Sequence, residues 1–163
     1  MIQISHEEDP YMFKKILFPT DFSETASKAM KVIEQLKCTG AEEVVVVHII
    51  DRRTLDALLK LETEASIRTN TNTVKEEKEQ RIGQVESKME TVKKELESKG
   101  FTVKTRIEID VPFLAILKAE KEEAVSVIVI GSHGLSNIEE MLLGSVSEKV
   151  IRKAKSPVIV VKR

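Results

Sequence analysis

The chain has 163 residues, of which 41% are hydrophobic and 33% are charged, so its size and apolar content favour one domain with a single core over two domains. The 26 Lys and Arg residues are matched by 27 Asp and Glu residues, and the net charge of −1 argues against binding to nucleic acid or to an anionic membrane. The one cysteine, Cys38, excludes an internal disulfide and suits a reducing compartment.

Residues 1–12 are a polar stretch that we expect to be a flexible leader, followed by a single domain over residues 13–163. The leader contains acidic residues and no apolar core of signal-peptide length. No later stretch approaches the ~20 apolar residues that a membrane span needs. These features predict a cytoplasmic protein with no membrane partner.

The domain alternates five predicted strands with four predicted helices. Most strands are short apolar runs, whereas residues 101–109 alternate apolar and polar residues, which predicts a strand with one wet face near a sheet edge. Each helix repeats apolar residues every three or four positions or begins with capping residues. The strands are expected at 13–18, 44–50, 101–109, 125–130 and 158–161. The helices are expected between Ser23 and Gly40, over 74–99, from Pro112 onward, and over 145–155, where Ser145 and Glu148 match a capping box. Residues 51–73 give the weakest pattern, with a short helix expected at 55–61 and a loop at 68–73.

Strands that alternate with helices need crossover connections, which are right-handed and produce a parallel sheet with helices on both faces. In a doubly wound sheet of order 3-2-1-4-5, ligands bind outside the carboxyl ends of the strands where the order reverses, between the first and fourth strands. The first strand ends at Pro19-Thr20-Asp21 and the fourth ends at Gly131. We therefore expect these two loops to meet at one crevice.

The loop after the fourth strand has the pattern of a phosphate cradle built from backbone groups. It contains Gly131-Ser132-His133-Gly134 and, just before the next predicted helix, Gly144-Ser145. Glycines lack a Cβ, so the loop can adopt positive φ and an anion can approach its amide nitrogens. Residues 145–147 add free first-turn N–H groups and two hydroxyls at the positive end of the helix dipole. A simple tight turn is the alternative, since a glycine pair after a strand is common.

The candidate site has few groups suited to catalysis. No Lys or Arg lies between Gly131 and Glu148, so a Walker A loop is excluded and binding is favoured over phosphoryl transfer. Asp21 is expected either to cap the first helix or to accept a hydrogen bond from a ribose hydroxyl or an adenine amino group. His48 is expected to be a hydrogen-bonded strand residue, and His133 to face the cradle without acting as a catalytic base.

Together these residues resemble the ATP-binding branch of the universal stress protein family, in its archaeal form. The nucleotide signature of that branch, Gly-x2-Gly-x9-Gly-Ser/Thr, is met by Gly131, Gly134, Gly144 and Ser145. Glu148 departs from a simple anion site, because it adds a negative charge beside the implied phosphates. The resemblance spans nearly the whole chain, and the matching stretches are Ile16–Ala26, Glu42–Asp51, Gly131–Val150 and Pro157–Arg163.

The resemblance implies a Rossmann-like, adenine nucleotide alpha hydrolase-like sheet of order 3-2-1-4-5 with helices on both faces. It also implies a nucleotide-dependent regulatory module of the stress response, and a homodimer formed through Val158–Val161, a strand whose bare edge needs cover. A slow ATPase or nucleotidyl-transfer enzyme that uses Asp21 and a bound divalent metal is the alternative function. A nucleotide-free scaffold for partner proteins is a third interpretation.

The implied ligand is ATP, with AMP or ADP as alternatives, and a Mg²⁺ or Mn²⁺ ion held through the phosphates. In the implied arrangement the adenosine lies between Pro19, Asp21 and the backbone of Ile49, and the phosphates lie on residues 134–137 and 145–147. The nucleotide-binding residues that the resemblance implies are Pro19, Thr20, Asp21, Ile49, Ile130, Gly131, Ser132, His133, Gly134, Asn137, Gly144, Ser145, Val146 and Ser147.

Overall fold

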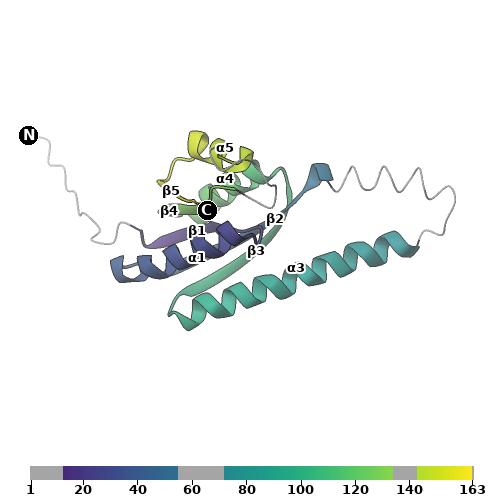
Figure 1. Cartoon of the computed structure of the whole chain (residues 1–163), viewed down its shortest axis with the longest axis horizontal. Helices are drawn as coiled ribbons and strands as arrows, with labels where there is room; N and C mark the ends of the chain where they lie inside the picture. Colours follow the sequence, from purple (N-terminus) through teal and green to yellow (C-terminus); the bar gives the residue numbers. More distant parts are fainter. Residues whose placement is uncertain (1–12, 55–71, 134–142, 163) are drawn as a thin grey trace, which may run out of the picture.

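Five parallel strands form a sheet in the order β3-β2-β1-β4-β5 (Figure 1), which confirms the predicted fold class and strand order. The computed structural model describes residues 13–54, 72–133 and 143–162, and over 72–81 it describes the backbone alone. The strands are β1 (Lys15–Pro19), β2 (Glu43–Asp51), β3 (Thr102–Asp110), β4 (Val127–Gly131) and β5 (Val158–Val161). The short helix predicted at 55–61 lies outside the described residues.

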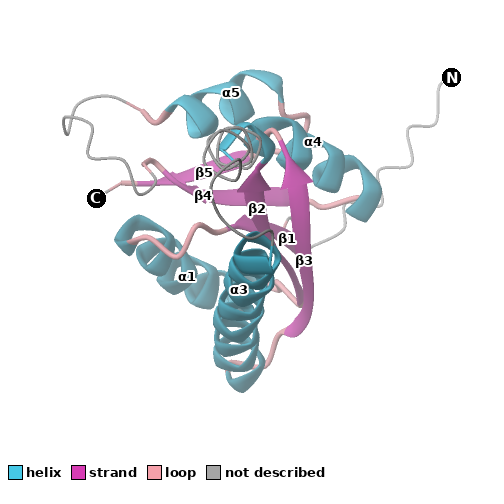
Figure 2. Cartoon of the chain, turned by 90° about the vertical axis from the view of Figure 1, so that its right-hand side faces the viewer, coloured by secondary structure: helices cyan, strands magenta, loops and turns pink. Residues whose placement is uncertain are grey.

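Helices cover both faces of the sheet (Figure 2). Side chains that alternate along each strand divide the core in two: Phe18 packs under α1 and α3, whereas its neighbour Leu17 packs under α4 and α5. None of the helices in the described ranges is long and apolar enough to cross a membrane. The helices are α1 (Glu24–Leu36), α3 (Asn72–Ser98), α4 (Pro112–Glu123) and α5 (Ser145–Lys153).

The helix starts follow the chemistry of the capping residues. Ser23 is the N-cap of α1, and its Oγ accepts a hydrogen bond from the Ala26 N–H at 3.3 Å. Pro112 is the first residue of α4, as predicted. The start of α3 at Asn72 corrects the prediction, since the helix takes in the last two residues of the polar run that was expected to be a loop.

Two helix ends depart from the prediction: α1 ends at Leu36 and is followed by a 3₁₀-helix over Lys37–Thr39 before Gly40, and α5 also ends early. The backbone N–H groups of Lys155 and Ser156 donate to Glu120 Oε1 at 2.8 and 2.6 Å. This carboxylate, which is 7% exposed, satisfies donors that would otherwise continue α5, so the helix ends at Lys153 rather than at 155. The end of α3 matches expectation, because Gly100 follows the helix with a φ of +87°.

Candidate functional site

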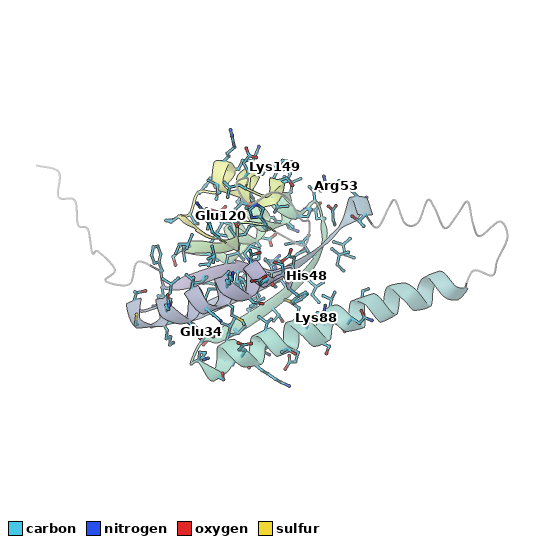
Figure 3. The ribbon with its side chains drawn as sticks, viewed as in Figure 1. Glu34, His48, Arg53, Lys88, Glu120 and Lys149 are labelled. Atoms are coloured by element: carbon cyan, nitrogen blue, oxygen red, sulfur yellow. The ribbon has the colours of Figure 1, made fainter. Side chains whose placement is uncertain are left out.

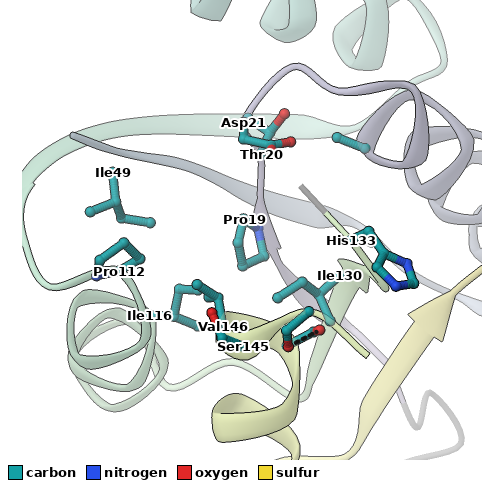
Figure 4. Close-up of a pocket in the computed structure, with 14 residues that line it drawn as sticks. Pro19, Thr20, Asp21, Ile49, Pro112, Ile116, Ile130, His133, Ser145 and Val146 are labelled. Atoms are coloured by element: carbon teal, nitrogen blue, oxygen red, sulfur yellow. Dashed lines mark hydrogen bonds between the residues drawn. The ribbon is translucent and has the colours of Figure 1, made fainter. Parts of the chain in front are cut away.

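A cavity of about 240 Å³ lies at the carboxyl ends of β1 and β4, where the strand order reverses (Figure 4). Of the predicted set, Ser132 does not line it, and Gly134 and Asn137 lie outside the described residues. The remaining predicted residues come together there, although they are far apart in sequence. The lining is Pro19, Thr20, Asp21, Ala26, Ile49, Pro112, Ile116, Ile130, Gly131, His133, Gly144, Ser145, Val146 and Ser147.

Three lining residues were missed from the sequence: Ala26, Pro112 and Ile116. Pro112 and Ile116 stand in the first turns of α4, which follows β3 and therefore begins at the same edge of the sheet as the cavity. Together with Ile49 and Ile130 they form an apolar wall (Figure 4). A topological signal existed for them, because every helix that follows a parallel strand starts at this edge.

Asp21 is the charged carboxylate of the lining within the described residues. Its Oδ1 accepts a hydrogen bond from the Ser23 N–H at 3.1 Å, so Asp21 shapes the turn before α1 while Ser23 caps the helix. The helix-cap interpretation of Asp21 is therefore wrong. Its Oδ2 makes no hydrogen bond to the described residues, which leaves one acceptor for a ligand.

Gly131 and Gly144 lack a Cβ for a reason other than the predicted positive φ. Gly131 is the last residue of β4, and Gly144 has φ −61° and ψ 147°, so neither belongs to the positive-φ glycines of the described chain. A Cβ on Gly131 would lie 3.0 Å from Thr25 Oγ1 and 3.2 Å from the Thr25 carbonyl carbon. A Cβ on Gly144 would lie 3.0 Å from the Ser132 carbonyl oxygen. These glycines allow close packing of α1 on β4 and of α5 on the loop.

The start of α5 faces the cavity with peptide N–H groups. The first hydrogen bond within the helix runs from the Glu148 N–H to the Gly144 carbonyl at 2.9 Å, so the N–H groups of residues 145–147 precede it and have no acceptor within the helix. They stand at the positive end of the helix dipole. Among the described residues, the cavity is lined by no Lys or Arg, so an anion there would be held by backbone groups.

The predicted capping box of α5 is wrong. Gly144 is the N-cap and makes no side-chain capping bond, and Ser145 is already helical. Glu148 pairs instead with Arg152, with 3.0 Å between a carboxylate oxygen and Nη2, which offsets part of its negative charge. Ser147 is also engaged: its Oγ lies 2.8 Å from the carbonyl oxygens of Ser132 and Gly144, so its proton is directed into the loop rather than toward a ligand.

Ser132 holds the loop together and is only 1% exposed. Its N–H donates to the Val161 carbonyl at 2.8 Å, and its carbonyl accepts from the Gly144 N–H at 2.8 Å. One peptide segment therefore joins the glycine loop to β5 and to the start of α5. Ser132 therefore lies behind the cavity lining, and the nucleotide contact implied for it stays a prediction.

His133 lines the cavity, and its ring is fixed by the loop. Its Nδ1 lies 2.9 Å from Ser132 Oγ, and its carbonyl accepts a hydrogen bond from the Thr25 hydroxyl. Its Nε2 is buried and has no hydrogen-bond partner in the described part of the chain.

His48 is a hydrogen-bonded strand residue, as predicted. Its Nδ1 lies 2.8 Å from the Thr20 carbonyl oxygen. Burial lowers the pKa of His48, and this effect outweighs the opposing influences of the Thr20 hydrogen bond and of Asp21. The ring is therefore neutral near pH 7, and because a carbonyl only accepts, the ring proton sits on Nδ1.

The comparisons with known proteins agree with one another. The sequence model described as the Universal stress protein family matches residues 12–162. Universal stress protein MJ0577 of Methanocaldococcus jannaschii is 44% identical over 156 residues, which make up 93% of this chain and 96% of that protein. A solved structure of MJ0577 matches with a TM-score of 0.77 and covers 93% of this chain and 97% of that one.

Two further relatives extend the comparison. Universal stress protein YxiE of Bacillus subtilis is 31% identical over 156 residues, or 93% of this chain and 100% of that protein. A universal stress protein from Archaeoglobus fulgidus, solved in complex with dAMP, is 22% identical, with a TM-score of 0.57 and coverage of 93% of this chain and 99% of that one. At that identity the second likeness concerns the fold.

Proposed function

Because the chain belongs to the universal stress protein family, we propose that it binds ATP in the cavity and acts as a nucleotide-dependent regulatory module of the stress response in the cytoplasm. AMP or ADP would occupy the same place with fewer phosphates. The observation that carries the proposal is the division of the cavity into an apolar end beside Ile49 and Pro112 and an N–H-rich end at the start of α5. A nucleotide has the same division, since a base with apolar faces is joined through the ribose to an anion.

In the proposed complex the base and ribose lie along the apolar wall, near Pro19, Asp21 and the backbone of Ile49. The phosphates lie on the N–H groups of residues 145–147 and on Gly134–Asn137, which are outside the described residues. The free Asp21 Oδ2 would accept a hydrogen bond from the ribose or the base. These residues bind and orient the ligand, and none of them supplies the lysine that phosphoryl transfer in P-loop proteins uses.

A Mg²⁺ or Mn²⁺ ion would be held mainly through the phosphates. Among the described residues, no group of three His, Cys, Asp or Glu side chains is placed to hold a metal ion. The lining offers Asp21 as its one carboxylate within those residues. A bound divalent ion would supply the positive charge that the described lining lacks.

Isothermal titration with ATP, AMP and GTP tests the proposal, with the expectation that the adenine nucleotides bind in the micromolar range and GTP binds more weakly. The absence of any adenine nucleotide binding below millimolar concentration would sink it. Mass spectrometry of ligand released from the natively purified protein separates a nucleotide-binding protein from a nucleotide-free scaffold. In that measurement we expect an adenine nucleotide.

The homodimer through β5 is part of the proposal. The N–H of Ser132 donates to the Val161 carbonyl, and the Ile128 N–H donates to the Pro157 carbonyl, so alternate residues face β4 and Val160 turns its peptide outward. Val160→Pro removes one outward N–H without touching the bonds to β4. We expect it to shift the dimer toward monomer in light scattering, whereas Val160→Ala, which loses similar packing but keeps the N–H, remains dimeric.

A slow ATPase or nucleotidyl transferase is the second candidate, because the free Asp21 Oδ2 and the unpartnered His133 Nε2 belong to residues of the same cavity. Such groups can orient a water molecule next to a phosphate. Phosphate release in the presence of Mg²⁺, compared between the wild type and Asp21→Ala, tests for this activity. Equal rates for the two proteins would remove this candidate and leave the binding function standing.

A further inference from the structure

The segment of β2 that lines the cavity lies beyond the end of its neighbour β1. Within β2, the Glu43 N–H donates to the Lys14 carbonyl, and the Val47 carbonyl accepts from the Thr20 N–H, so the odd-numbered residues turn their peptide groups toward β1. Ile49 follows the same alternation. Since β1 ends at Pro19, opposite Val47, the N–H and C=O of Ile49 face the region just beyond the end of β1, where the cavity lies.

A continued parallel ladder would consume both of these groups. The Ile49 N–H would donate to the Thr20 carbonyl, and the Ile49 carbonyl would accept from the Phe22 N–H. Neither bond forms in the described chain, although the residues that would make them stand at the right positions in sequence.

Two side chains bind the groups with which the Ile49 N–H and carbonyl would otherwise pair. His48 Nδ1 donates to the Thr20 carbonyl at 2.8 Å, and Thr20 Oγ1 accepts from the Phe22 N–H at 3.1 Å. Thr20 is 6% exposed, so its carbonyl needs a partner, and His48 supplies it from a neighbouring strand. Because these two side-chain hydrogen bonds replace the backbone bonds, the ladder ends one step early and the peptide of Ile49 stays unpaired.

The turn is held in this form by further contacts. Phe22 has a φ of +61°, a left-handed conformation that costs free energy for a residue with a bulky side chain. Its ring stacks on the His48 ring with 4.7 Å between centroids, and Lys88 Nζ of α3 lies 5.4 Å from the Phe22 ring centroid. Figure 3 shows His48 on β2 and Lys88 on α3, so the contacts that hold the turn come from the turn itself, from β2 and from α3.

We propose that His48 is a positioning residue for base recognition: by holding the Thr20 carbonyl away from Ile49, it keeps the Ile49 N–H free to donate to the base. Thr20 Oγ1 does the same for the Ile49 carbonyl. This inference rests on the proposed function. An adjacent N–H and C=O match the N1 acceptor and the amino donor of adenine, whereas guanine presents a donor and an acceptor in the reverse arrangement.

The matched variants are His48→Phe, which keeps a ring to stack on Phe22 but has no donor, and His48→Asn, which keeps a donor at the position of Nδ1 but has no ring. The probes are ATP and 1-deaza-ATP, in which a C–H replaces the N1 acceptor. The wild type is expected to prefer ATP by about tenfold, the worth of one hydrogen bond to an otherwise unpaired group. His48→Asn should keep that preference. In His48→Phe the Thr20 carbonyl takes the Ile49 N–H, and the preference should fall to about twofold or less.

Thr20→Val tests the Ile49 carbonyl separately from the Ile49 N–H, because it removes Oγ1 and releases the Phe22 N–H to the Ile49 carbonyl. It should reduce the preference for ATP over purine riboside triphosphate, which lacks the amino group, and leave the preference over 1-deaza-ATP intact. Thermal melting of each variant checks that the fold persists.

The outcomes separate the two proposals. A wild type that binds no adenine nucleotide would overturn the proposed function. A wild type that binds ATP, together with a His48→Phe protein that keeps the full preference over 1-deaza-ATP, would overturn this inference alone. Loss of the preference in His48→Asn but not in His48→Phe would also overturn it, since stacking and not the hydrogen bond would then control the site.

Discussion

The two ends of the cavity present the same kind of group, the peptide, but they free it in different ways. At the α5 end the N–H groups are unpaired because every helix begins with donors that have no acceptor. At the β2 end the peptide of Ile49 is unpaired because His48 and Thr20 take its ladder partners. The first arrangement is a property of secondary structure, whereas the second depends on individual side chains. Substitutions should therefore act on the two ends through different physical effects.

The largest expected effect is that of Gly131→Val. A Cβ at this position would meet Thr25 within 3.0–3.2 Å, so the valine should loosen the packing of α1 on β4 and reduce the free energy of unfolding by about 1–3 kcal/mol. Urea unfolding measures this. Ala29→Ser, which places a hydroxyl one turn further along the buried face of α1, gauges how far the packing of α1 tolerates change. An unfolding curve equal to that of the wild type, with nucleotide binding lost, would show that the side chain enters the ligand path instead.

The next effect concerns the N–H groups of α5. Ser145→Pro removes one N–H at the first helical position, where proline fits, and Gly144 before it is already extended with ψ 147°. ATP affinity should fall by about tenfold with little change in stability, since one charge-assisted hydrogen bond is lost. Ser145→Ala removes only the hydroxyl and should bind within about twofold of the wild type. Equal losses for the two variants would assign the contact to the hydroxyl rather than to the backbone.

A smaller effect is expected from Glu148→Gln. The substitution removes a carboxylate from the first turn of α5 and releases Arg152 from its pair. Affinity for ATP should rise by about two- to fivefold at low salt, and the gain should shrink as salt screens the charges. Glu42→Gln removes the same net charge at the amino ends of the strands, away from the cavity, where Glu42 pairs with Lys14. It should leave the affinity unchanged. A similar gain in both variants would show a general charge effect.

The smallest effect is the pH dependence that His48 imposes on stability. Asp21 favours its protonation and Lys88 opposes it, while the Thr20 carbonyl holds Nδ1–H and the Phe22 ring covers one face. Burial dominates and lowers the pKa of His48, so the unfolded chain binds the proton more readily than the folded one. The stability that neutral His48 contributes is fully present above pH 6.5, the ordinary pKa of the unfolded state. It is lost as the pH falls through the lowered pKa of the folded state. Unfolding at pH 7.5 and 5 should show a larger loss in the wild type than in His48→Asn.

The sequence allowed the fold and the place of the cavity to be predicted, because both depend on patterns that neighbouring residues carry. Apolar runs that alternate with helical periodicity imply a parallel sheet, and the loops at Asp21 and Gly131 follow the two strands that flank its switch point. The spacing of Gly131, Gly144 and Ser145 then marked the α5 end. Free N–H groups at a helix start need no tertiary contact to exist, so local sequence was sufficient there.

The remaining features depend on contacts between distant residues. The need for glycine at position 131 comes from Thr25, and the polar partner of Ser147 is the Ser132 carbonyl. The β2 end is the clearest case, since His48 looks like any strand histidine until its bond to Thr20 is seen. The predicted capping of α5 was also wrong, because the N-cap is Gly144 and not Ser145, and the sequence pattern alone does not distinguish two adjacent positions.

Ser132 has a mechanical consequence. Its N–H donates to the last residue of β5 and its carbonyl accepts from Gly144, the N-cap of α5, so a shift of β5 along its own direction displaces the start of α5 as well. The last strand of the sheet and the helix start that would lie beneath a bound anion are thus connected through one peptide segment. Exchange of the Ser132 and Gly144 amide hydrogens with solvent should then slow together, whether the protein is stiffened at β5 or inside the cavity.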